Sequence, residues 1–280
     1  MSTETLTRIE RAIEERFGTK IPVAADQAGA DALVRILEHR SHRRYSAQPL
    51  SAELLQLLFA CALSAPSKSD LQQADIVHVS DRVKRSAIAD LIPDNLWVRS
   101  APELLVFCGN NRRTRQVAAQ RGKPFANDHL DAFMNAAVDA GIVMTTFIHA
   151  AEAAGLGCCP ISSVRNCAQA VSDLLGLPDW VFPVAGLCVG YPAEAGTITS
   201  RLPLDVPVHV DCYDESGIAA KIDGYDRRRD ARQPYQQQRG VERYGKADFY
   251  GWSEDKARQY AVPQRMDFGA FIRAKRFNLT

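Results

Sequence analysis

The chain has 280 residues, of which 46% are hydrophobic and 24% are charged. This composition is typical of a globular protein and excludes a largely disordered chain, a collagen or a coiled-coil rod. The net charge is only +1, from 34 Lys and Arg against 33 Asp and Glu. Because nucleic-acid-binding chains usually show a clear basic excess, we expect no nucleic-acid partner.

The chain shows no membrane or secretion signal. No uninterrupted apolar run approaches the ~18 residues of a membrane span. The N-terminal sequence MSTETLTRIERAIEERFG mixes acids and bases and lacks the apolar centre of a signal peptide. We therefore expect a cytoplasmic protein with no membrane partner.

Charge is distributed unevenly along the chain. Residues 221–280 hold 14 Lys and Arg against 8 Asp and Glu, whereas residues 1–220 hold 20 against 25. The basic part is rich in Gln, Tyr and Arg and poor in aliphatic residues, which is typical of an excursion over the surface. We expect a helical extension at 1–27, a core at 28–220, and a basic excursion with a C-terminal arm at 221–280.

The first half of the chain contains three helical patterns and two strand patterns. Apolar residues at helical spacing predict helices over residues 4–17 and 28–40. Ser51 is a plausible N-cap for a buried helix, AELLQLLFACALSA, which ends before Pro66. The runs DIVHVS (75–80) and ELLVFCG (103–109) predict strands, the second of them fully buried.

The long segment 128–154 predicts a buried helix. Its apolar residues cover most of the helical circumference, and many are small, which lets another backbone approach closely. Gly155 supplies a left-handed cap. A short strand (CCPI), a helix (164–175) and a strand (181–192) follow, so the chain has an α/β or α+β sheet covered by helices.

The common catalytic motifs are absent. The chain has no Walker loop, no G-x-G-x-x-G after a strand and no G-x-S-x-G elbow. Its six histidines do not occur at metal-ligand spacing, so we expect no metal. The seven cysteines are expected to be small buried hydrophobes in a reducing compartment.

Four polar segments remain as candidates for chemistry. The segment HRSHRRY (39–45) places cations and a hydroxyl together, as a phosphate site requires. The segment APSKSDLQ (65–72) can present hydroxyls and an amide to a heteroaromatic edge. GCCPISS (157–163) follows the long helix, and TSRLP (199–203) follows the last strand. Taken alone, HRSHRRY is also consistent with a solvated helix end, and APSKSDLQ with an ordinary connector.

In this order and at these separations, the four segments resemble the FMN-dependent nitroreductase family. HRSHRRY is similar to its R-S-x-R-x-[FY] phosphate motif, and APSKSDLQ to its A-P-S-x-x-N-x-Q loop. The segments LLGLP and VAGLCVGYPAE resemble its C-terminal half. PISSVRNCAQAV, SRLP and the tryptophan of WSE (252–254) are closest to its NADPH-linked nitroreductase and flavin reductase subgroup.

The resemblance implies a fold, a cofactor and a set of site residues. The fold is α+β, a mixed sheet flanked by helices, in an interwoven homodimer with a long central helix and two FMN molecules at the subunit interface. Phosphate-binding residues are expected among the cations and the hydroxyl of the first and last segments, and flavin-lining residues among the others. The expected cofactor-binding residues are His39, Arg40, Ser41, Arg43, Ser67, Ser69, Asp70, Gln72, Asn95, Pro160, Ile161, Ser162, Ser163 and Arg201. Arg227, Arg228 and Arg232 are expected to bind the 2′-phosphate of NADPH.

The implied function is an NAD(P)H-dependent FMN oxidoreductase that reduces nitroaromatics, quinones or flavins with ping-pong kinetics. In such an enzyme no side chain need act as a catalytic nucleophile, because the flavin supplies the hydride chemistry. The alternative is a flavin-binding or flavin-storage relative with little turnover. Four positions depart from the family pattern: Asp70 replaces an Asn, Ser162 and Ser163 replace a glycine pair, and Thr199 replaces a lysine.

Overall fold

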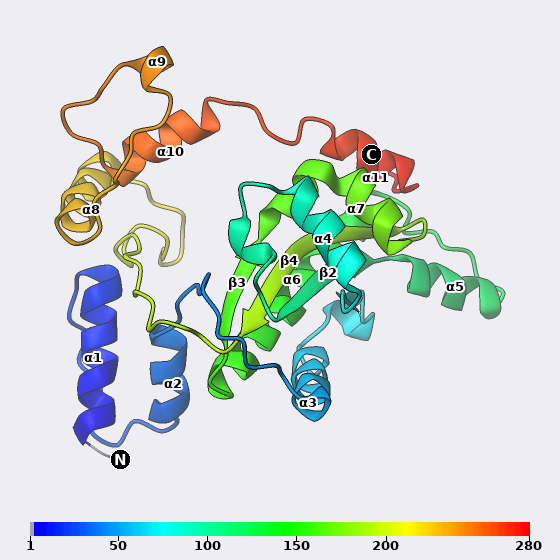
Figure 1. Ribbon diagram of the computed structural model, residues 1–280, viewed down its shortest axis with the longest axis horizontal. Coiled ribbons are helices and arrows are strands. Elements are labelled where there is room, and N and C mark those ends of the chain that lie inside the picture. Colours follow the sequence, from blue (N-terminus) through cyan, green and yellow to red (C-terminus); the bar gives the residue numbers. More distant parts are fainter. Residues whose placement is uncertain (1–2) are drawn as a thin grey trace. The chain divides into compact units, whose positions relative to one another are not determined.

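The computed structural model describes residues 3–280 and divides into two compact units (Figure 1). The helical unit comprises the N-terminal segment that ends at Arg40 together with Thr197–Gln264. The core unit comprises Ser41–Gly196 and Arg265–Thr280. The N-terminal helices and most of the basic excursion therefore belong to one unit, and the end of the chain belongs to the other.

The core unit contains a four-stranded sheet with the order β1-β2-β4-β3 (Figure 1). Its strands are β1 (Ala74–His78), β2 (Glu103–Asn110), β3 (Gly157–Ile161) and β4 (Val181–Gly190). The predicted α+β class with a helix-flanked sheet is confirmed. The sheet differs from the expected mixed one in that its three strand pairs are all antiparallel. Within residues 3–280, parallel pairing is limited to the isolated bridge between Ser41 and Cys158.

Helices cover both faces of this sheet. α3 (Ala52–Leu63) and α6 (Leu130–Ala153) pack on one face, where the β2 side chains Leu105 and Phe107 join their apolar cluster. The alternate β2 side chains join the cluster beneath α4 (Arg82–Leu91) and α7 (Ala168–Leu175) on the other face. Burial on both faces explains why β2 is a continuous apolar run instead of an alternating one. The remaining elements of this unit are η1 (Lys68–Asp70), η2 (Leu96–Val98), α5 (Arg112–Gln120), η3 (Ser162–Cys167) and α11 (Phe268–Ala274).

The predicted long helix is present as α6 and ends before Gly155, whose φ of 80° is the left-handed conformation expected of its cap. By length and composition alone, α6 is apolar enough to cross a membrane. In this protein it lies across the sheet instead, with Ala140 and Phe147 fully buried. Asp139 is also buried in α6, and its carboxylate accepts hydrogen bonds from the loop after α3. α6 therefore serves as a core helix of this unit.

β4 contains an irregularity that matters for its free edge. Phe107 pairs with Ala185 and Cys108 pairs with Pro183, so Val184 forms a bulge between them. Pairing with β3 begins only at Gly186. The first half of β4 therefore has β2 as its only neighbouring strand among the described residues.

The helical unit has a much smaller apolar core. In it α1 (Thr3–Phe17) packs beside α2 (Ala30–Leu37), as the apolar spacing predicts (Figure 1). Ile9, Ile13 and Val34 are the large buried residues of their shared cluster. The excursion is not irregular, because it forms helices with an internal hydrogen-bond network. Its helices are α8 (Ile218–Arg232), α9 (Val241–Tyr244) and α10 (Trp252–Tyr260).

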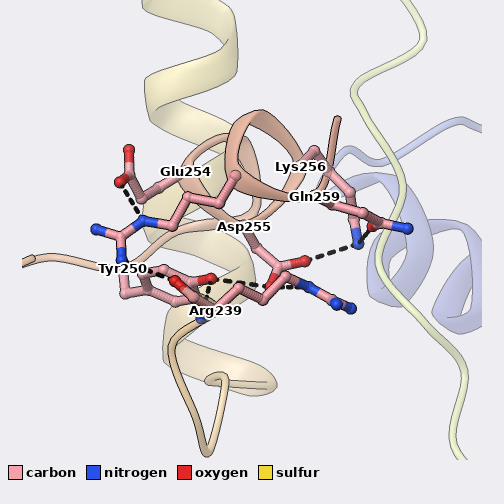
Figure 2. Close-up of polar contacts among 7 residues, drawn as sticks. Arg239, Tyr250, Glu254, Asp255, Lys256 and Gln259 are labelled. Carbon is pink, nitrogen blue, oxygen red and sulfur yellow. Dashed lines mark hydrogen bonds and ion pairs between the residues drawn. The ribbon is translucent and has the colours of Figure 1, made fainter. Parts of the chain in front are cut away.

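A buried carboxylate, Asp255, organises the end of this excursion (Figure 2). Its oxygens accept hydrogen bonds from Arg239 Nε at 3.0 Å, from the Tyr250 hydroxyl at 3.0 Å and from Lys256 Nζ at 2.7 Å. Arg258 is buried nearby and donates to the carbonyls of Arg239 and Gly245, each at 2.9 Å. The segment 239–245 is therefore held in place by charged side chains and not by apolar packing.

Candidate flavin-binding site

The segment that carries Ser41 and Arg43 is pinned to the edge of the sheet in the core unit. The backbone N–H of His42 donates to the carbonyl of Cys158 at 2.9 Å, and Tyr45 forms a bridge to Pro192. Gly157 permits this close approach, since a Cβ there would lie 2.7 Å from the His42 ring. Ser41 and Arg43 therefore stand on a fixed backbone next to β3.

Arg43 lies beside two further segments of the core unit. Its guanidinium carbon is 5.1 Å from the centroid of the Trp97 ring, a cation–π arrangement. Burial raises the pKa of the Cys159 thiol, and the neighbouring Arg43 charge opposes that shift. The structure thus brings the predicted phosphate segment, the segment of Asn95 and Trp97, and β3 together.

Asn95 has an unsatisfied buried acceptor. Its Oδ1 is buried and has no hydrogen-bond partner among the described residues. A buried amide oxygen without a partner costs about 1–3 kcal/mol, so it indicates a group that completes its hydrogen bond. An N–H of a flavin ring fits that acceptor, and this observation agrees with the predicted role of Asn95.

The loop after α3 is held in an unusual conformation. Ser69, Asp70 and Gln72 have φ values of 50°, 54° and 52°, which non-glycine residues adopt rarely. The buried carboxylate of Asp139 anchors this loop, accepting from Ser67 Oγ at 2.8 Å, Lys68 N at 3.0 Å and Gln73 N at 3.2 Å. Such strain persists only when the surrounding contacts over-determine it, and it is concentrated at binding sites.

This loop also borders a cavity of about 940 Å³ in the core unit. Ser67, Asp70 and Gln72 line it, and Gln72 Nε2 donates to Asp70 Oδ1 at 3.2 Å. Asp70, which stands where the family motif has Asn, is therefore an exposed acceptor that already receives a hydrogen bond from Gln72. Asp139 was missed from the sequence because an acid in a helix carries no motif, and its partners lie about 70 residues away.

The turn from β3 into η3 holds the next four predicted residues. Ile161 is buried, whereas Pro160 and Ser162 are exposed and Ser163 is half-buried. Ser162 Oγ accepts a hydrogen bond from Arg265 Nη2 at 3.0 Å, and Arg265 Nε donates to Asn166 at 2.7 Å. Arg265 also has a φ of 56°. Its contact with a predicted site residue was not visible in the sequence, because the two groups are separated by about a hundred positions.

His39, Arg40 and Arg201 lie in the helical unit. Arg201 is exposed, and its Nη1 donates to the Thr199 hydroxyl at 2.7 Å. The residue found in place of the family's lysine therefore supports the Arg201 guanidinium.

The three arginines predicted for the NADPH phosphate differ in their surroundings. Arg227 is exposed, and its side chain makes no hydrogen bond or ion pair within residues 3–280. Arg228 Nη2 donates to the Arg201 carbonyl at 2.6 Å, and Arg232 forms an ion pair with Glu15 at 3.6 Å. Arg228 and Arg232 thus have internal partners, and the role of all three in nucleotide binding stays a prediction.

Two family models and a curated relative match this chain. The model of the nitroreductase family matches residues 36–191, and the model of the nitroreductase family C-terminal domain matches residues 200–280. An FMN reductase [NAD(P)H] of Bacillus subtilis is 34% identical over 195 residues, which cover 68% of this chain and 78% of the relative. The chain belongs to the nitroreductase family.

Solved structures support the same assignment. The structure of NfrA2 from B. megaterium superimposes with a TM-score of 0.81 at 30% identity, covering 89% of this chain and 99% of that one. The NADPH:FMN oxidoreductase of Vibrio harveyi, solved with NAD+, gives a TM-score of 0.75 at 31% identity, covering 88% and 97%.

Proposed function

We propose that this protein is an FMN-dependent NAD(P)H oxidoreductase that reduces small acceptors such as nitroaromatics, quinones or flavins with ping-pong kinetics. The observation that carries this proposal is the meeting of three predicted flavin segments in the core unit. Ser41 and Arg43, Asn95 and Trp97, and β3 lie together, and Asn95 Oδ1 has no hydrogen-bond partner among the described residues. The names of the relatives support NAD(P)H as the reductant and FMN as the cofactor.

The residues have distinct roles in this proposal. Arg40, Ser41, Arg43 and Arg201 hold the FMN phosphate through charge-assisted hydrogen bonds, with His39 beside them. Asn95 accepts a hydrogen bond from the flavin ring, and Ser67, Ser69, Asp70 and Gln72 of the second subunit lie along the ring. Pro160, Ile161, Ser162 and Ser163 form the wall against one flavin face.

FMN held by these residues would supply the hydride chemistry that links the nicotinamide to the acceptor. The protein supplies orientation and charge. Asp139 fixes the strained loop, and Arg265 fixes the Ser162 hydroxyl at the turn after β3. Because Arg265 is cationic and next to that turn, it also favours anionic groups of a nucleotide or acceptor there.

The proposal includes a homodimer in the cytoplasm. α6 and α3 present large apolar side chains outward that a monomer would leave in water. Leu57, Leu63, Leu130, Met134 and Val138 are all between 43% and 60% exposed. Contiguous exposed apolar side chains on packed helices favour an interface with a second copy. Sedimentation of the flavin-loaded protein as a single monomeric species at low micromolar concentration would contradict the dimer.

The decisive experiment is an anaerobic titration of the purified yellow protein, which should carry about one FMN per chain. NADPH should bleach the flavin band, and a nitroaromatic or a quinone should restore it. A protein whose flavin no pyridine nucleotide bleaches would instead be a flavin-storage relative.

A further inference from the structure

The N-terminal helix α1 lies outside the residues that the family models match, which begin at 36 and 200. It is nevertheless tied to the segments that carry the predicted phosphate ligands of the helical unit. Its last turn contains Arg16, whose side chain is buried. A buried guanidinium is costly unless its N–H groups are hydrogen-bonded. The hydrogen-bond partners of Arg16 therefore identify the segments that this helix fixes.

Four hydrogen bonds join the Arg16 side chain to backbone carbonyls on two separate segments. Nη2 donates to the carbonyls of Leu37 at 2.9 Å and His39 at 2.7 Å, and Nε donates to Leu37 at 3.1 Å. Nη1 donates to the carbonyl of Thr199 at 3.3 Å. One planar side chain therefore spans from the segment before Arg40 to the segment before Arg201.

The backbone around Arg201 is held on both sides. Its N–H donates to the carbonyl of Arg16 at 2.7 Å, and its own carbonyl accepts from Arg228 Nη2 at 2.6 Å. Arg228 reaches this point by passing over Gly18, where a Cβ would lie 2.2 Å from its Nη1. Gly18 also has a φ of 70°, so a side chain is excluded there by both space and conformation.

We propose that Arg16 is a positioning residue that holds the His39–Arg40 and Thr199–Arg201 backbones in the arrangement that binds the FMN phosphate. In this view the N-terminal helix is part of the cofactor site and not an appendage. The inference rests on the proposed function, since it presumes that these segments bind FMN. A lysine can replace Arg16 only in part, because an ammonium is a point charge without the planar set of donors that reaches three carbonyls.

The test compares FMN with riboflavin, which lacks the phosphate. Equilibrium dialysis of the full-length protein with each flavin gives two dissociation constants for the wild type, Arg16→Ala, Arg16→Lys and the control Arg11→Ala. Arg11 is an exposed arginine of the same helix. We expect the FMN dissociation constant to rise about tenfold in Arg16→Ala, equal to about 1.4 kcal/mol, and less in Arg16→Lys. Riboflavin binding should stay within about twofold for every variant.

The ratio of the two constants separates positioning from general destabilisation. Equal losses of FMN and riboflavin affinity, with a lower Tm, would assign Arg16 a merely structural role and overturn the inference. An unchanged FMN constant in Arg16→Ala, while Arg201→Ala loses FMN affinity, would overturn the inference and leave the proposed function standing. A wild type that binds neither flavin would overturn both. If Arg16→Ala does not fold, the FMN-to-riboflavin ratio of Arg16→Lys decides.

Discussion

The two units of this protein are stabilised in different ways. In the core unit three apolar clusters fill both faces of the sheet, and β2 has no exposed face. In the helical unit one small apolar cluster is supplemented by buried charged side chains, Arg16, Asp255 and Arg258. Apolar burial tolerates changes of pH and salt, whereas charged networks depend on ionisation and on the identity of each partner. The comparison indicates that the core unit depends mainly on apolar packing and that the helical unit depends more on ionised side chains, so it should be the more sensitive of the two to pH and salt.

The largest expected effect comes from emptying the core. Phe147 is fully buried and packs against Phe107 and Phe59 with ring centroids 6.0 Å apart in each case. Phe147→Ala should lower the free energy of unfolding by about 3–5 kcal/mol, because it removes contacts and leaves a cavity. Urea denaturation followed by circular dichroism measures it, with the exposed Val83→Ala as the control. A loss below about 1 kcal/mol would contradict the core assigned here.

The helical unit should respond most to loss of its central acid. Asp255→Asn removes the charge that Arg239 and Lys256 face, and we expect a loss of about 1.5–3 kcal/mol. Faster limited proteolysis within Thr197–Gln264 would report it, while Ser41–Gly196 should resist cleavage as in the wild type. Asp248→Asn, an exposed acid of the same excursion, is the control. If Asp255→Asn and Asp248→Asn resisted proteolysis equally well, the role of the Asp255 hydrogen-bond network would be refuted.

The same carboxylate makes the helical unit sensitive to acid. Burial raises the pKa of Asp255, but the hydrogen bonds from Lys256 and Tyr250 and the nearby charges outweigh it, and the pKa lies below its ordinary value. A lowered folded-state pKa stabilises the fold above the unfolded value of about 3.9, and this contribution is lost as the pH falls through the folded pKa. Proteolysis of the wild type should therefore accelerate below about pH 4, and Asp255→Asn should lack this dependence. An identical acid profile in both proteins would contradict the assignment.

An effect of similar size, on cofactor binding and not on stability, is expected for the phosphate ligands. Arg43→Ala removes a charge-assisted contact of about 1.5–3 kcal/mol, so FMN should bind roughly ten- to hundredfold more weakly. Arg44→Ala is a matched control, because Arg44 is exposed and pairs with Glu194 at the surface. The FMN dissociation constants of the two variants are measured by flavin fluorescence as the protein is diluted. Equal FMN affinity in the two variants would remove Arg43 from the site.

The smallest effect concerns nucleotide choice. We expect NADPH to be preferred over NADH by at least about tenfold in kcat/KM, which needs only ~1.4 kcal/mol. Arg227→Ala should reduce that preference with little cost in stability, because Arg227 has no internal partner within residues 3–280. Arg228→Ala and Arg232→Ala should also lower stability, since both side chains hold the N-terminal helix or its neighbours. The preference should fall as salt rises, and equal use of both nucleotides by the wild type would exclude the role.

The sequence was sufficient for elements whose residues form periodic apolar patterns. Ser51 caps α3 by accepting from the Leu54 N–H, and the Gly155 cap is where the pattern predicts it. Such features depend on neighbours within a few residues. The contacts of Asp139, Arg265 and Arg16 join positions about 20 to 180 apart, and several of their partners are backbone groups, which carry no sequence signature.

The excursion shows the same limit. Its composition predicts surface charge, and Asp226 could be expected to neutralise neighbouring arginines. Asp226 is instead buried and accepts hydrogen bonds from Ser253 at the start of α10. An acid at a helix N-terminus satisfies backbone N–H groups, and only the fold determines that this acid comes from another helix.

The bulge in β4 has a consequence for self-association. A strand whose N–H and C=O groups lack a neighbour can pair with another molecule and begin aggregation. In the first half of β4, Pro183 has no N–H to offer, and Arg165 donates to the carbonyl of the bulged Val184. This stretch of β4 therefore has one missing donor and one occupied acceptor. Beyond the end of β3, β4 is therefore a poor template for pairing with a strand of another molecule. We expect a variant with Pro183→Val and Arg165→Ala to form fibrils more readily when concentrated.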